Sequence, residues 1–186
     1  MMRALLLVLA LSGNAQAADW NVATLFEMIA KERPARATFH ERKFMALLDR
    51  PLESSGELAF TPPDRMEKRT LLPREERVTV DRERVTLERG GKRYSIGLRE
   101  NPALAVLVES IRATLAGDLA ALTYSYSVGL EGTPARWRLT LRPLDPAGQQ
   151  IVERIDIDGA HAVVKAVEIR QADGDRSVMT ITPVAR

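Results

Sequence analysis

The feature that most constrains this chain is an alternation of apolar and polar residues that recurs along most of its length. Successive side chains of a β-strand point to opposite faces, so this period of two is typical of strands that bury one face of a sheet. About eleven such runs follow Ala35, and the links between them are too short for parallel crossovers. The sequence therefore predicts an α+β chain, mainly β, built on one antiparallel sheet.

Turn residues separate the runs. Gly90-Gly91 stands between two alternating segments, where a tight hairpin needs positive φ. Asp158-Gly159 and Asp173-Gly174 are predicted to form two further turns, and the prolines at 62–63 a fourth. The alternation at residues 124–130 predicts another strand.

Two segments have a helical period instead. Apolar residues from Trp20 to Ile29 fall on one side of a helix that Pro34 would end. A longer helix is predicted from Asn101 and Pro102, a cap and a first helical residue, to Gly117. Its apolar stripe comprises Leu104, Leu107, Val108, Ile111 and Leu115. Asp118 can then cap another short turn.

So many antiparallel strands must close or be covered, because exposed edges recruit other chains. A curved sheet or incomplete barrel results. A barrel of more than about eight strands is too wide for side chains to fill, so it needs a plug, a ligand or a lid. The helix at 102–117, inserted midway between the two halves of the sheet, is the predicted lid.

The start of the chain has the pattern of a secretory signal peptide. Arg3 precedes an apolar run at residues 4–11, and Ala15-Gln16-Ala17 forms a small-x-small cleavage site. We expect residues 1–17 to be removed, the remainder to reach the periplasm, and residues 18–186 to form a single domain. The chain has no cysteine, so its core alone must stabilise it.

Composition argues against several functions. The 27 basic and 25 acidic residues are interspersed, which does not suit nucleic-acid binding. The two histidines, His40 and His161, lie in no metal-ligand spacing, and no nucleophile elbow, phosphate loop or dinucleotide motif is present. We expect no metal, no cofactor and no enzyme, and we expect a monomer.

Six apolar side chains at the inward phase of their strands are candidates for a lipid-binding cavity: Phe39, Leu58, Phe60, Met66, Trp137 and Leu139. The alternative is that they simply form a packed core. Periodicity does not distinguish a filled interior from a hollow one, so both interpretations stay open at this point.

Several short motifs follow one another in an informative order: Phe39-x-Glu41, Ser55-Gly56-Glu57-Leu58-x-Phe60, Val78-x-Val80-Asp81, Leu115-Ala116-Gly117-Asp118-Leu119, Trp137-x-Leu139-x-Leu141 and Asp173-Gly174-Asp175-Arg176-Ser177. In order and spacing they resemble the outer-membrane lipoprotein carrier (LolA-like) superfamily, over nearly all of the chain after residue 17. The resemblance implies an incomplete barrel with a helical lid over a hydrophobic cavity. It departs at Pro62, where the typical carrier has an arginine that helps to hold the lid closed, which suggests a divergent branch.

The resemblance also implies a function. We expect a periplasmic carrier or chaperone that shelters lipoprotein acyl chains or another lipid, between inner-membrane donor and outer-membrane acceptor proteins. Sheltering is needed because each methylene exposed to water costs about 0.8 kcal/mol. The alternatives are a regulatory or sensing module of the same fold that binds a protein partner and, with no residues in its favour, an enzyme acting on an acyl or glycosyl lipid.

Overall fold

The computed structural model describes residues 20–31 and 35–184. The predicted signal peptide at residues 1–17 and the predicted helix stop at Pro34 lie outside these ranges. The first described element is helix α1 (Val22–Ala30), whose N-terminus is capped by Asn21. It buries Leu25, Phe26 and Ile29 on one face, as the apolar pattern predicts.

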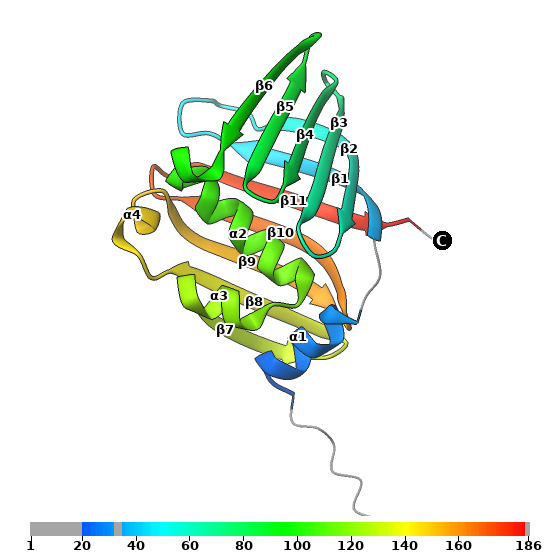
Figure 1. Ribbon diagram of the computed structural model, residues 1–186, viewed down its shortest axis with the longest axis vertical. Coiled ribbons are helices and arrows are strands. Elements are labelled where there is room, and N and C mark those ends of the chain that lie inside the picture. Colours follow the sequence, from blue (N-terminus) through cyan, green and yellow to red (C-terminus); the bar gives the residue numbers. More distant parts are fainter. Residues whose placement is uncertain (1–19, 32–34, 185–186) are drawn as a thin grey trace, which may run out of the picture.

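Eleven antiparallel strands form one sheet that does not close, which confirms the predicted fold class (Figure 1). The strands are β1 (Ala35–Phe44), β2 (Leu52–Thr61), β3 (Arg65–Leu72), β4 (Glu76–Asp81), β5 (Arg84–Arg89), β6 (Lys92–Gly97), β7 (Tyr126–Thr133), β8 (Arg136–Pro143), β9 (Val152–Ala160), β10 (Val163–Gln171) and β11 (Arg176–Pro183). Their order is β6-β5-β4-β3-β2-β1-β11-β10-β9-β8-β7. The first and last strands therefore pair at the centre, and β6 and β7 are the two edges.

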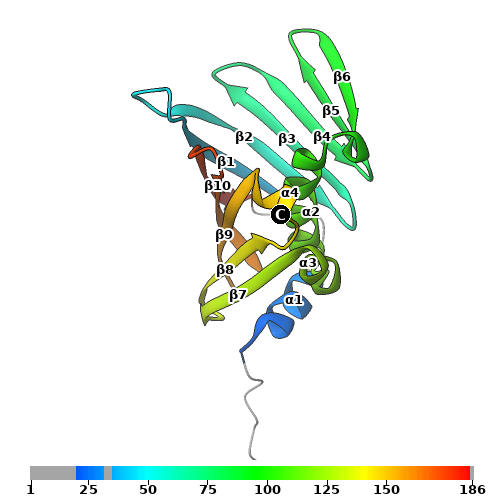
Figure 2. The same cartoon turned by 90° about the vertical axis from the view of Figure 1, so that its left-hand side faces the viewer.

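The helices lie on the inner side of the curved sheet (Figure 2). The predicted lid is α2 (Pro102–Ala116), preceded by the short η1 (Leu98–Glu100). Asn101 caps it by accepting a 3.0 Å hydrogen bond from the backbone N–H of Leu104, and Gly117 ends it at a φ of 68°. Asp118 caps α3 (Leu119–Ser125), and the sequence pattern did not indicate α4 (Pro146–Gln149). Among the described residues, no helix has both the length and the apolarity to cross a membrane.

Two local predictions were wrong. Asp158-Gly159 lies inside β9, and the turn comes later at His161, which has a φ of 52°. Gly159 serves packing instead, because a Cβ added there would lie 2.1 Å from the indole ring of Trp137. Tyr124 belongs to α3 and is 88% exposed, since the helix that Asp118 caps continues to Ser125. The turns at Gly90-Gly91 and at Gly174 are confirmed by positive φ values.

The core consists of two separate clusters of buried residues. The larger cluster joins α1, α3 and one residue of α2 to strands β7 to β9: Leu25, Phe26, Ile29, Ala113, Leu122, Tyr126, Trp137, Leu139, Leu141, Val152, Ile155 and Ile157. The smaller cluster joins β4 and β5 to η1 and α2: Val80, Val85, Leu98 and Val108. Because α2 contributes Ala113 to one cluster and Val108 to the other, it bridges the two halves of the sheet.

Candidate functional site

Between the two clusters, the inner face of the sheet carries apolar side chains that belong to neither. Phe39 of β1 is opposite Ile181 of β11, and Leu58 of β2 and Met179 of β11 share their face by strand alternation. Phe39 is 4% exposed, whereas the other three are only partly buried. We call this set, together with Ile111 and Leu115 of α2, the central strip.

Helix α2 stands over this strip. Ile111 and Leu115 are four residues apart and so lie on one helix face. At 100° per residue, that face points between Leu107, which packs on the larger cluster, and Val108, which is buried in the smaller one. Both residues are only partly buried. The helix is thus held on both sides of the strip and packs incompletely above it.

The six predicted cavity residues do not form one wall. Trp137 and Leu139 are 1% and 0% exposed within the larger cluster. Met66 packs against the smaller cluster, and Phe60 is buried but belongs to neither. Of the six, the central strip contains Phe39 and Leu58. That these residues contact lipid stays a prediction. The packing favours Phe39 and Leu58 as lipid contacts over Trp137 and Leu139, which are fully buried in the larger cluster.

The five predicted lid residues divide in the same way. Leu104 and Val108 pack in the smaller cluster and Leu107 against the larger one, while Ile111 and Leu115 remain for the strip. The apolar stripe of α2 therefore consists of residues that pack in the core and residues that remain partly exposed. The helical spacing of these residues does not distinguish the two groups.

A polar group next to the strip was missed by the sequence analysis. Glu41 forms an ion pair with Lys68, and its carboxylate accepts hydrogen bonds from the hydroxyls of Ser177 at 2.6 Å and Ser54 at 3.4 Å. Lys68 Nζ lies 4.8 Å from the centroid of the Phe39 ring. The sequence does contain a signal for this group, because Glu41 has the same inward position in the strand alternation as Phe39, where a charged side chain is unusual.

The electrostatics of this group depend on Lys68. Burial on its own raises the pKa of Glu41. The positive charge and hydrogen bond of Lys68, with the two serine hydroxyls, outweigh burial and hold the pKa of Glu41 below its ordinary value. The carboxylate next to the strip is therefore ionised and fully partnered, so it adds no unpaired charge to an apolar surface.

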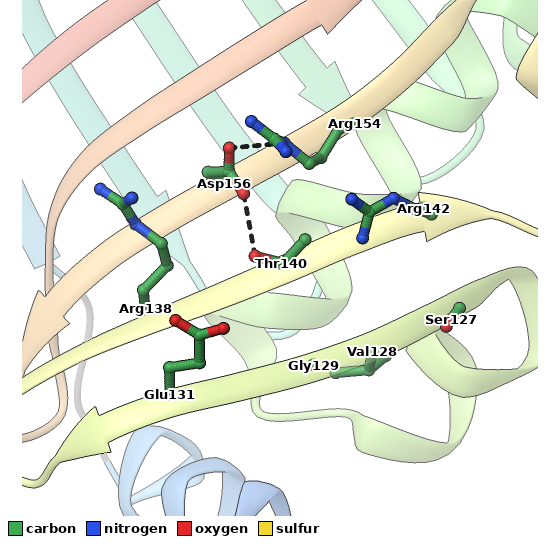
Figure 3. Close-up of a pocket in the computed structure, with 9 residues that line it drawn as sticks. All are labelled: Ser127, Val128, Gly129, Glu131, Arg138, Thr140, Arg142, Arg154 and Asp156. Carbon is green, nitrogen blue, oxygen red and sulfur yellow. Dashed lines mark hydrogen bonds and ion pairs between the residues drawn. The ribbon is translucent and has the colours of Figure 1, made fainter.

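Two hollows stand out among the described residues, and neither touches the central strip. One, of about 350 Å³, lies on the outer face over β7, β8 and β9, where Gly129 lacks a side chain (Figure 3). It is lined by charged groups, among them Arg154, which pairs with Asp156 at 2.8 Å. The other surrounds the turn between β5 and β6. The described part of the chain contains no group of three metal-ligating side chains.

Comparison with known proteins gives a clear family match. Residues 12–186 match the model of the family described as "Outer membrane lipoprotein carrier protein LolA-like". No curated protein matches the chain in sequence.

Similar solved structures include a LolA superfamily protein, NE2245, from Nitrosomonas europaea, at 8% identity and a TM-score of 0.48, covering 88% of this chain and 92% of that one. A DUF1329 family protein from Desulfovibrio piger ATCC 29098 is similar at 10% identity and a TM-score of 0.46, covering 87% and 88%. LprF from Mycobacterium bovis is similar at 12% identity and a TM-score of 0.38, covering 88% and 94%.

Proposed function

The chain belongs to the outer membrane lipoprotein carrier protein LolA-like family, and on that basis we propose that it is a periplasmic carrier that holds the acyl chains of lipoproteins, or of another lipid, on its central strip. The observation that carries the proposal is the strip itself. Apolar side chains of three central strands and of α2 belong to neither of the two packed clusters, and most of them stay partly exposed. A surface of this kind gains free energy when an apolar ligand covers it.

The gain from such a ligand is large enough for transport. An acyl chain that lays about ten methylenes on the strip gains roughly 8 kcal/mol, at about 0.8 kcal/mol for each methylene removed from water. Part of that gain is offset by moving α2, because neither of the two hollows named above for residues 20–31 and 35–184 lies at the strip. The net affinity therefore depends on how easily α2 moves, which suits a protein that must also release its cargo.

The contacts of α2 favour one direction of movement. At its C-terminal end, a Cβ added to Gly117 would lie 2.6 Å from the backbone N of Ala30, so α1 and α2 are in close contact. The hydroxyl of Tyr126 donates a hydrogen bond to the carbonyl of Val106. Both contacts tie α2 to the half of the molecule that contains the larger cluster. We therefore place the opening at the smaller cluster, where Val108 would separate from Val80 and Val85.

The proposal extends to location and partners. The signal-like pattern at residues 1–17 supports export to the periplasm. A carrier in that compartment takes its cargo from an inner-membrane donor and gives it to an outer-membrane acceptor. Binding and release need no catalytic group, so the proposed role is not enzymatic.

The first test is the identity of what the protein binds. Protein purified from the periplasm is expected to carry lipid, detected by native mass spectrometry, and to bind a fluorescent fatty acid. If no lipid co-purifies and the fatty acid does not bind, the proposal is wrong. If a single protein partner co-purifies instead and its binding is indifferent to lipid, the chain is a partner-binding module of the same fold.

A variant pair locates the binding surface. Replacing Ile111 by Asp places a carboxylate against the acyl chain and is expected to weaken fatty-acid binding at least about tenfold, with a small loss of stability because Ile111 belongs to neither cluster. Tyr124→Asp adds the same charge to an exposed position on α3 and is expected to bind as the unmodified protein does. Equal affinity of the two variants would show that the strip is not the binding surface.

A further inference from the structure

Strand β6 forms one edge of the sheet, and neither view shows a neighbour beyond it (Figures 1 and 2). The backbone N–H of Leu98 donates to the carbonyl of Glu83 at 2.8 Å, in line with the register of β5 and β6. Antiparallel pairs alternate between bonded and non-bonded, so β6 turns the backbone groups of Ile96 and Tyr94 toward β5. The backbone groups of Arg93, Ser95 and Gly97 therefore point outward, free to bond another strand.

The inner face of β6 carries two exposed apolar side chains. Val85 of β5 is 6% exposed under α2, but Ile96, its neighbour on β6, is 39% exposed. Tyr94, the neighbour of Leu87, is 52% exposed. The apolar rows of the sheet thus continue past the part that α2 covers, up to an open edge. Natural proteins usually protect such an edge, because it is a template for pairing.

We propose that β6 pairs with β6 of a second copy of this chain, antiparallel, around a two-fold axis at Ser95. This proposal departs from the monomer that the sequence analysis expects. The outward-pointing groups select this register, because it bonds Ser95 to Ser95 and Arg93 to Gly97 of the second copy. Opposite residues share a face, so Tyr94 of each copy packs against Ile96 of the other. A slip by one residue would place these apolar side chains against polar ones and lose the match.

The charges on the outer face fit the same register. A Cβ added to Gly97 would lie 3.3 Å from the carboxyl group of Glu100, so that carboxylate covers the outer face of the glycine. Among the described residues, Glu100 has no ion pair. Arg93 shares the outer face and has a side chain that is 73% exposed, 3.4 Å from Glu88. In the proposed dimer, Arg93 of each copy stands opposite Gly97 and next to Glu100 of the other, which forms two new ion pairs.

The other edge lacks these features. On β7, Tyr126 is 2% exposed, and Val128 and Leu130 pack against the larger cluster. The proposed partner of β6 is a second copy because two antiparallel copies of this strand match each other in hydrogen bonds, apolar pairs and charge. The strand has six residues, so it buries less than the roughly 1,200 Å² of a stable interface. The dimer is therefore expected to be reversible and to form as the protein concentration rises.

Analytical ultracentrifugation of the purified exported protein tests the proposal. The mass is expected to rise from one chain to two with concentration. Arg93→Glu and Glu100→Arg are each expected to raise the dissociation constant at least about tenfold, and the double variant to restore it. Arg136→Glu, an exposed change near the opposite edge, is expected to have no effect. Sedimentation as one chain at every concentration, or a double variant no better than the single ones, would overturn the proposed pairing.

A cross-link tests the two-fold axis directly. The chain has no cysteine, so Ser95→Cys provides a single thiol. Bonded antiparallel pairs have Cα atoms about 5.5 Å apart, within the range that a disulfide spans. Oxidation is expected to yield a covalent dimer, whereas Ser127→Cys on the outer face of β7 is expected to stay monomeric. Equal yields from the two variants, or no dimer from Ser95→Cys, would contradict an axis at Ser95.

Discussion

Replacing Lys68 by methionine is expected to reverse the way in which Glu41 makes the stability of the protein depend on pH. Methionine keeps an apolar side chain over Phe39 and removes the charge that lies 4.8 Å from its ring centroid. Glu41 keeps its hydrogen bonds from Ser177 and Ser54. The substitution therefore isolates the loss of the ammonium group next to a largely buried carboxylate.

The sign follows from the causes of the pKa shift. In the unmodified protein the pKa of Glu41 lies below its ordinary value, so the group stabilises the fold above the unfolded-state pKa, about 4.3. That stabilisation is lost as the pH falls through the folded-state pKa. Without Lys68, burial is the largest remaining influence, and we expect it to outweigh the hydrogen bonds from Ser177 and Ser54 and to raise the pKa of Glu41 above its ordinary value. The group then destabilises the fold at neutral pH, and the stability recovers as the pH falls toward the unfolded-state pKa.

The exposure of the pair sets the size of the effect. Removing one partner of a fully buried ion pair costs about 3–5 kcal/mol. Here the side chains are 19% exposed for Glu41 and 31% exposed for Lys68, so solvent screens part of that cost. We expect the Lys68→Met variant to lose about 1–2 kcal/mol at neutral pH. The double variant with Glu41→Gln is expected to recover most of this loss, because an amide leaves no buried charge.

Denaturant unfolding at a series of pH values between neutral and about 4 measures these free energies. The single variant should approach the unmodified protein in stability as the pH falls. The stability of the double variant should not change with pH through residue 41, because glutamine does not ionise. If Lys68→Met is as stable as the unmodified protein at neutral pH, or loses stability on acidification as that protein does, Lys68 does not control the ionisation of Glu41.

Two further changes test the packing around the larger cluster. Gly159→Ala places a Cβ 2.1 Å from the ring of Trp137 and is expected to lower the free energy of unfolding, measured with denaturant, by about 1–3 kcal/mol. Gly129→Ala, whose Cβ would have its nearest atom at 4.0 Å, is expected to lower it less. Equal losses in the two variants would contradict the packing role of Gly159. Burial raises the pKa of Tyr126 to about 12, so an absorbance titration should show a tyrosine that ionises late and is missing in Tyr126→Phe. That variant also loses the hydrogen bond to Val106 and is expected to be about 1 kcal/mol less stable; an unchanged titration would contradict this assignment.

Local patterns in the sequence determined which segments are strands and which are helices. The period of two predicted the antiparallel sheet, and the caps at Asn101 and Gly117 predicted the limits of α2. These features depend on neighbours within a few residues, so the local sequence contains the information that fixes them. Tyr124 was assigned to a strand because the alternation of residues 124–130 begins two residues before β7, while the chain is still in α3.

Only the tertiary structure decided how each apolar face is used. Trp137 and Phe39 have the same alternation, yet one is packed in the larger cluster and the other lies in the central strip. Gly159 follows an aspartate as a turn glycine would, but the ring of Trp137 from the neighbouring strand requires it inside β9. Glu41 meets Lys68 and Ser177 because the curved sheet brings β1, β3 and β11 together. Contacts of this kind depend on residues far apart in the chain, and strand periodicity carries no information about them.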